Sequence, residues 1–299
     1  MFNKSSLISA LAVMTMASMP SQAIDTELLA GMKARNIGPA ATSGRISDVE
    51  AVIDNPNIIY ASAASGGVWK SVNAGLNWQP IFDDEDYASI GALAIFQQSP
   101  DILWVGTGEG NVRNSTSIGG GIYKSIDAGK SWTLMGLEKT ERINRIALHP
   151  TNPDIAYAAA MGTLWSENKE RGIYKTIDGG KSWQKILYVD EKTDPQNPNK
   201  LYASMWQFRR WPYRFESGGT GSGMYVSVDG GETWQKKTQE DGLPSGELGR
   251  ITFDISESHP NVVYALAEAE KSALLRSDDG GNKWHKVNET VGIADRPFY

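Results

Sequence analysis

The chain contains no cysteine and only three histidines among its 299 residues. Without cysteine it cannot form disulfides, so packing and hydrogen bonds must hold the fold together. The histidines, His149, His259 and His285, lack the close spacing of zinc ligands. Phosphate-binding loops and Gly-x-Ser-x-Gly elbows are also missing, and Asp278–Asn282 lacks the distal Glu of a calcium loop. We therefore expect no metal site and no cofactor.

Long apolar runs are missing beyond the N-terminus. Residues 1–23 place Lys4 before an apolar stretch from Leu7 to Met19 and end in Ser21-Gln22-Ala23. This layout predicts a secretory signal peptide cleaved near Ala23, and export to the periplasm or the extracellular space. No later segment approaches 18 apolar residues, so we expect no membrane span in the mature chain.

Positive charge is in deficit. The formal net charge is −6, and removal of residues 1–23, which hold Lys4 and no acid, makes it −7. A nucleic-acid partner needs a basic face for its phosphates, so the charge balance argues against such a partner.

The chain is rich in one repeated octapeptide, Ser/Thr-x-Asp/Asn-x-Gly-x-x-Trp. Its five copies end at tryptophans separated by 54, 51, 51 and 50 residues. Each copy follows short apolar strands and Asn-Pro turns in the same order, which predicts four strands per unit and an all-β fold, a β-propeller. The expected boundaries are a lead-in at 24–43, repeats at 44–89, 90–142, 143–193, 194–249 and 250–289 within 44–289, and the start of a further unit at 290–299.

The octapeptide matches the Asp-box, or BNR repeat. We expect its Asp or Asn to accept hydrogen bonds from its own turn, its Gly to adopt positive φ, and its Trp to be buried against the neighbouring blade. These residues are therefore predicted to be structural. They are Asn73, Trp78, Asp127, Trp132, Asp178, Trp183, Asp229, Trp234, Asp279 and Trp284.

The fourth unit is shorter than its neighbours. From the box Trp to the next inter-strand turn there are 21, 20 and 25 residues in three units, but 14 between Trp183 and Asn197. The spacing predicts that this unit lacks its first strand at the Thr193–Asp194 junction. Either the blade is abnormal or the sequence has lost about seven residues, by an in-frame deletion or a sequencing error.

A more specific resemblance covers residues 35–299. Gly106–Asn111, Gly121–Ser125, Met161–Trp165 and Arg171–Lys175 resemble the large secreted bacterial BNR-repeat proteins that carry a sortilin N-terminal-like region, here roughly 120–250. These proteins are often labelled glycosyl hydrolases, and they are normally longer. The resemblance implies that this chain is an internally deleted, C-terminally short member.

Hydrolysis would need two carboxyl groups across the glycosidic bond. Ala64 stands where the xyloglucan-active propeller hydrolases have a first-blade Asp, which argues against that mechanism. The weak catalytic candidates are Glu109, Glu167, Glu170 and Glu216. For Glu109, in a Gly-rich loop, the alternative is a solvated loop glutamate.

The fourth unit carries an insertion rich in aromatics and arginines between its second and third strands. Loops at this position gather on one face of a propeller, and such side chains are typical of binding sites for a glycan or a peptide. Alternatively, the aromatics pack under the loop and the arginines pair with nearby acids. The predicted ligand-binding residues are Trp206, Phe208, Arg209, Arg210, Trp211, Tyr213 and Arg214.

Overall fold

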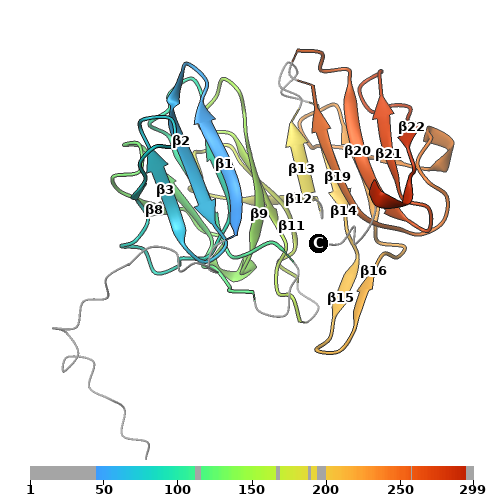
Figure 1. Ribbon diagram of the computed structural model, residues 1–299, viewed down its shortest axis with the longest axis horizontal. Coiled ribbons are helices and arrows are strands. Elements are labelled where there is room, and N and C mark those ends of the chain that lie inside the picture. The colour runs from blue at the N-terminus through green and yellow to red at the C-terminus, as the bar shows by residue number, and fades with distance from the viewer. Residues whose placement is uncertain are drawn as a thin grey trace, which may run out of the picture. The chain divides into compact units, whose positions relative to one another are not determined.

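The computed structural model describes residues 45–111, 116–165, 169–187, 190–193, 200–256 and 258–293. The chain divides into two units, 1–37 and 38–299, and all described residues belong to the second. The predicted signal peptide, the whole predicted lead-in and the end of the chain therefore lie outside the described residues. Within them, five antiparallel four-stranded sheets and one separate hairpin account for the strands (Figure 1).

Each sheet is one blade, and its strands follow one another along the chain. Blade 1 is β1 (Ile46–Val52), β2 (Asn55–Ala63), β3 (Gly67–Ser71) and β4 (Gln79–Pro80). Blade 2 is β5 (Ile90–Ile95), β6 (Leu103–Thr107), β7 (Ile122–Ser125) and β8 (Thr133–Leu134). Blade 3 is β9 (Ile143–Leu148), β10 (Ala156–Ala160), β11 (Gly172–Thr176) and β12 (Gln184–Leu187).

Blades 4 and 5 follow the same order. Blade 4 is β13 (Asp190–Thr193), β14 (Leu201–Met205), β17 (Gly223–Ser227) and β18 (Gln235–Lys237). Blade 5 is β19 (Leu248–Ile255), β20 (Val263–Ala269), β21 (Ala273–Ser277) and β22 (His285–Asn288). Short 3₁₀ turns occur at Glu138–Thr140, Gln239–Asp241 and Val291–Ile293.

The prediction that blade 4 lacks its first strand is wrong. β13 pairs with β14 from Asp190 opposite Ser204 to Thr193 opposite Leu201. The strand is made from the residues directly after β12, because pairing with β14 satisfies backbone groups that would otherwise be exposed at a sheet edge. The shortening falls in the connection between blades, where only residues 188 and 189 separate β12 from β13.

The apolar core consists of layers between consecutive blades. Tyr60 and Val68 of blade 1 pack with Leu93 and Val105 of blade 2, and Trp104 lies in the next layer with Ile146 and Tyr174 of blade 3. Further layers join blades 3 and 4 and blades 4 and 5. The first strands β1, β5, β9, β13 and β19 contact one another in this order, so one side of every blade faces the same axial region.

The octapeptide forms the turn between the third and fourth strands, as expected. In blade 2, the Asp127 carboxylate accepts hydrogen bonds from the backbone N–H groups of Lys130 and Ser131, at 3.0 and 2.9 Å. The buried Ser125 hydroxyl donates to Asp127 and accepts from the Gly129 N–H. The bonds equivalent to those of the Gly129 and Ser131 N–H groups recur in the other boxes, and every box glycine has positive φ.

The box tryptophans are less buried than expected. Only Trp284 is fully buried, at 5% exposed, and Trp78 is 38% exposed. The indoles of Trp132 and Trp183 donate to the carbonyls of Ile81 and Met135 in the preceding blade. Trp78 belongs to the first described blade, so no described blade precedes it to cover its ring.

Candidate functional site

A polar cavity of about 210 Å³ lies where the first strands begin. It is lined from blades 1 to 5, because the beginnings of β1, β5, β9 and β19 converge with the ends of β6 and β14. The polar and charged side chains that line it include Asp48 of β1, Glu109 after β6, Asn144 and Arg145 of β9, Ser204 of β14 and Arg250 of β19.

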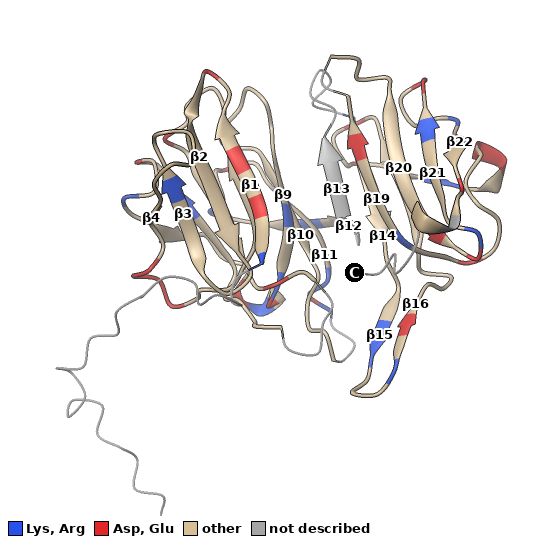
Figure 2. Ribbon diagram, viewed as in Figure 1, with Lys and Arg blue, Asp and Glu red and all other residues tan. Residues whose placement is uncertain are grey.

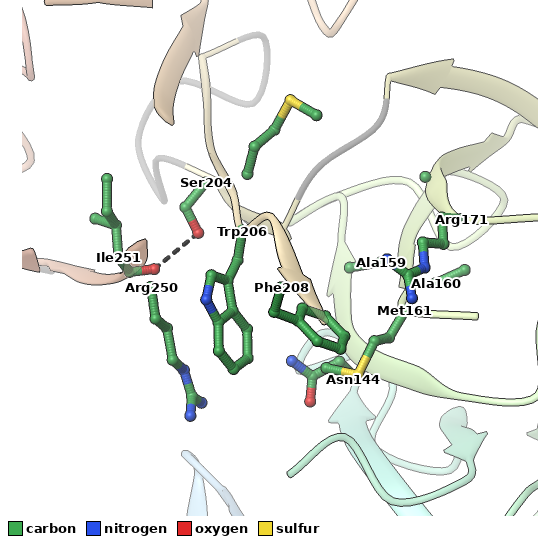
Figure 3. A pocket seen from close by; sticks show the side chains of 12 residues that line it. Asn144, Ala159, Ala160, Met161, Arg171, Ser204, Trp206, Phe208, Arg250 and Ile251 are labelled. Atoms are coloured by element: carbon green, nitrogen blue, oxygen red, sulfur yellow. Dashed lines mark hydrogen bonds between the residues drawn. The ribbon is translucent and has the colours of Figure 1, made fainter. Parts of the chain in front are cut away.

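A second hollow of about 80 Å³ adjoins it and shares Asn144, Ser204, Arg250 and Ile251. Its wall adds Trp206 and Phe208, and Figure 3 shows the Trp206 indole between the Arg250 side chain and the Phe208 ring. The Arg250 guanidinium lies 5.4 Å from the centre of the Trp206 ring. The Ser204 hydroxyl donates to the Ile251 carbonyl at 2.8 Å and thereby joins blades 4 and 5 beside both hollows.

Loops from successive blades meet at this end of the blades. Arg142, which precedes β9, is buried and donates to the Gly162 carbonyl and the Thr116 hydroxyl, at 3.3 and 3.2 Å. Its partner carboxylate is Glu141, at 3.0 Å, and burial lowers the pKa of the Arg142 guanidinium. Arg142 therefore ties the long loops of blades 2 and 3 together.

Glu109 is not a solvated loop residue. Its side chain is buried, at 4% exposed, and forms an ion pair with Arg45, which precedes β1. Its backbone N–H donates to the Ser117 carbonyl within the same loop, at 3.2 Å. Of the four glutamates singled out by sequence, it is the one that lines the cavity.

The other predicted glutamates do not join Glu109. Glu216 lies on the hairpin and pairs with Arg214. Glu170 accepts a hydrogen bond from the Tyr174 hydroxyl, and burial together with this carboxylate raises the pKa of Tyr174 to about 12. Glu167 lies outside the described residues.

Asp48 is the cavity acid that sequence reasoning missed. Its carboxylate accepts hydrogen bonds from the backbone N–H groups of Val49, at 3.0 Å, and Leu93, at 3.2 Å. A polar residue near the beginning of a first strand was the available signal, because these strands face the axis of a propeller. Arg145 and Arg250 occupy comparable positions in β9 and β19, and the sequence offered the same signal for them.

The insertion of blade 4 forms a β-hairpin that extends beyond the blade (Figure 1). β15 (Phe208–Arg210) pairs with β16 (Phe215–Ser217), and Arg and Glu lie on opposite strands (Figure 2). Trp206, Phe208 and Phe215 pack together against Leu164 of blade 3. For these three aromatics the structure therefore agrees with the alternative that the side chains of the insertion pack against the protein itself.

The tip of the hairpin is different. Tyr213 is 87% exposed, and the guanidinium groups of Arg209 and Arg214 lie 5.6 and 5.9 Å from the centre of the Trp211 ring. Arg210 lies 5.3 Å from the Phe215 ring, and Arg214 pairs with Glu216 as the self-packing alternative expected. Binding through the tip stays a prediction.

In the described part of the chain, no cluster of three or more potential metal ligands occurs. None of the helices described there is both long and apolar enough to cross a bilayer.

Known proteins share the repeat and the fold of this chain. The BNR/Asp-box repeat model matches residues 225–236, which include the box of blade 4. An ancestral GH74 enzyme of known structure superimposes with a TM-score of 0.61 at 20% identity, over 85% of this chain and 32% of that one. The fold is a β-propeller of Asp-box blades.

Two curated relatives share sequence over most of the propeller. A xyloglucanase from Paenibacillus is 25% identical over 244 residues, which is 72% of this chain and 23% of the relative. An oligoxyloglucan-reducing end-specific xyloglucanase from Emericella nidulans is 24% identical over 231 residues, which is 71% of this chain and 27% of the relative. The chain thus spans about a quarter of the length of these relatives.

Proposed function

We propose that this propeller binds a glycan at the axial cavity, with the blade 4 hairpin beside it. The observation that carries the proposal is the convergence of polar side chains from five blades on one hollow at the end where the long loops meet. Hydroxyl, amide and charged groups are suited to sugar hydroxyls, and propeller loops of this kind carry binding functions. The names of the curated relatives, all xyloglucanases, support a glycan over a peptide.

A binding assay separates the cavity from the hairpin. We expect a soluble polysaccharide in the gel to retain the purified chain during affinity electrophoresis. Asn144→Ala should abolish this retention without lowering the melting temperature. The matched variant is Trp211→Ala at the hairpin tip. Loss of retention only in Trp211→Ala would move the site to the hairpin, and no retention across neutral and acidic polysaccharides would refute glycan binding.

Hydrolysis is the second candidate, because two carboxylates, Asp48 and Glu109, line the cavity. Two carboxyl groups are what glycoside cleavage requires. Release of reducing ends from xyloglucan, lost in both Asp48→Asn and Glu109→Gln, would establish an enzyme. Retention of the polysaccharide without product would establish a binding protein.

The predicted signal peptide at 1–23 and the resemblance to secreted sortilin-like BNR proteins support export of the chain. Expression with its own N-terminus should yield an exported protein that begins at Ile24. An uncleaved protein that still carries residues 1–23 and is found in the cytoplasm would contradict this proposal.

A further inference from the structure

Three arginines along the two hollows have no acidic partner among the described residues. Arg145 and Arg250 line the larger hollow, and Arg171 and Arg250 line the smaller one. Other arginines in the described ranges do form ion pairs, among them Arg45, Arg142, Arg214 and Arg276. A protein with a formal charge of −6 thus places unpaired positive charge around its cavity.

Two of these guanidinium groups lie against aromatic rings and not against carboxylates, and that of Arg171 also donates to the Thr163 carbonyl at 2.8 Å. Arg171 lies 4.9 Å from the Phe208 ring centre, and Arg250 lies 5.4 Å from that of Trp206. The two rings lie 4.6 Å apart, so Arg171, Phe208, Trp206 and Arg250 form a continuous row on one wall (Figure 3). A cation held on a ring face is oriented while its charge remains available to a ligand.

The base of the hairpin holds this row in place. The Trp206 indole N–H donates to the Ser217 hydroxyl at 2.9 Å, and Ser217 donates to the Glu268 carboxylate at 2.6 Å. The same carboxylate accepts from the Arg250 backbone N–H at 2.7 Å. Glu268 therefore bonds to the backbone of Arg250 and leaves its guanidinium unpaired.

The acids of the cavity leave positive charge in excess. Glu109 is paired with Arg45, so Asp48 is the one lining carboxylate without an ion pair within the described residues. The fork of an arginine side chain matches a carboxylate in two parallel hydrogen bonds. Ser47, Asn111 and Asn144 beside these arginines offer groups for hydroxyls.

We infer that the cavity binds a glycan whose sugars carry carboxylates, a uronic-acid glycan, with Arg145 and Arg250 on a carboxylate and Arg171 extending the positive wall. This inference rests on the proposed glycan-binding function and specifies its ligand. Neutral glycans would leave the arginine charges unpaired in the complex, which costs binding free energy.

The test compares trigalacturonate with its fully methyl-esterified form by titration calorimetry at low salt. The ester has the same sugars without the charge. We therefore expect its affinity to be lower than that of trigalacturonate by a factor on the order of 10 or more. Arg250→Gln and Arg145→Gln should each weaken trigalacturonate binding on the order of 10-fold, and Arg250→Lys should restore only part of the loss. Arg276→Gln is the matched control, because Arg276 pairs with Asp278 in the Asp-box turn of blade 5.

The outcomes separate the inference from the proposed function. Equal binding of acid and ester, or binding of neutral xyloglucan alone, would overturn the inference and leave glycan binding intact. Binding of an acidic peptide with no glycan bound, or no binding to any of these probes, would overturn both. Near-ultraviolet circular dichroism checks that each variant is folded, and Arg145→Gln keeps the test decisive if Arg250→Gln does not fold.

Discussion

At the scale of single residues, the Asp-box turns show why the octapeptide has its composition. The box glycine needs more than positive φ, because it also contacts the preceding blade. A Cβ on Gly129 would lie 2.5 Å from Ile81, and one on Gly180 would lie 2.8 Å from Trp104. The turn motif and the packing between blades therefore select the same residue.

The box carboxylates give the protein a specific acid sensitivity. Side-chain hydrogen bonds from Ser182 and Thr233, followed by backbone N–H groups, lower the pKa of Asp178 and Asp229 from 3.8 to about 2. Bonds from Ser131 and Ser125 also lower the pKa of Asp127. Because these folded-state values lie below the unfolded ones, the stability they contribute is present above about pH 4 and is lost as pH falls toward 2.

The prediction is a flatter acid profile when these charges are removed. The variant Asp127→Asn/Asp178→Asn/Asp229→Asn should lose less melting temperature between pH 5 and pH 2.5, in thermal scans, than the parent protein does. Asn73 occupies the same position in blade 1, where its amide oxygen accepts from the Asn77 N–H at 2.9 Å, so the turn tolerates asparagine. Identical profiles for parent and variant would refute this account.

At the scale of elements, a lysine in the third strand joins each of the first three blades to the next one. Lys70, Lys124 and Lys175 donate to the carbonyls of Ala128, Gly179 and Gly230, at 3.0, 3.2 and 2.9 Å. Each lysine also lies over an aromatic ring of its own blade, and Trp104 is the ring beside Lys124, at 4.5 Å. The repeated lysine is thus a contact between blades.

We expect Lys124→Met to lower the free energy of unfolding by about 1 kcal/mol, because the hydrogen bond to Gly179 is lost while the apolar stem is retained. Urea unfolding measures the change. Lys130→Met is the control, since Lys130 is exposed in the box of the same blade. Equal effects of the two substitutions would show that the contact between blades contributes nothing.

The hairpin shows where sequence reasoning reached its limit at this scale. The aromatic and arginine content of 206–217 indicated an unusual insertion, but not which rings pack together and which are exposed. Trp206 and Phe208 are held by Leu164 of another blade, whereas Tyr213 is exposed at the turn. That division depends on contacts between segments more than 40 residues apart, and local composition does not encode such contacts.

At the scale of the whole molecule, the layers between blades are unequal. Between blades 3 and 4, the central cluster of buried apolar side chains in the described part of the chain is small and consists of Ala159, Ile173 and Ala203. The layer between blades 1 and 2 contains larger groups such as Tyr60, Phe82 and Leu93. Less apolar area buried means less stabilisation of the interface.

Hydrogen exchange should report this difference. We expect the amides of β12 and β14, which flank the thin layer, to exchange faster than those of β5 and β6 in native-state exchange measured by mass spectrometry. Uniform protection of all four strands would show that the layers open together, as a single cooperative unit.

The sequence by itself determined the blade architecture, because the octapeptide brings its own turn: the Ser/Thr hydroxyl, the carboxylate and the glycine satisfy the same backbone groups in every copy. The four-strand order followed from equally local signals. Only the tertiary structure decided that Asp190–Thr193 replaces the strand predicted to be missing, since a strand is defined by its partner. It also decided that Asp48, Glu109, Arg145 and Arg250, from four blades, share one cavity, because their proximity comes from the packing of the blades and not from any spacing along the chain.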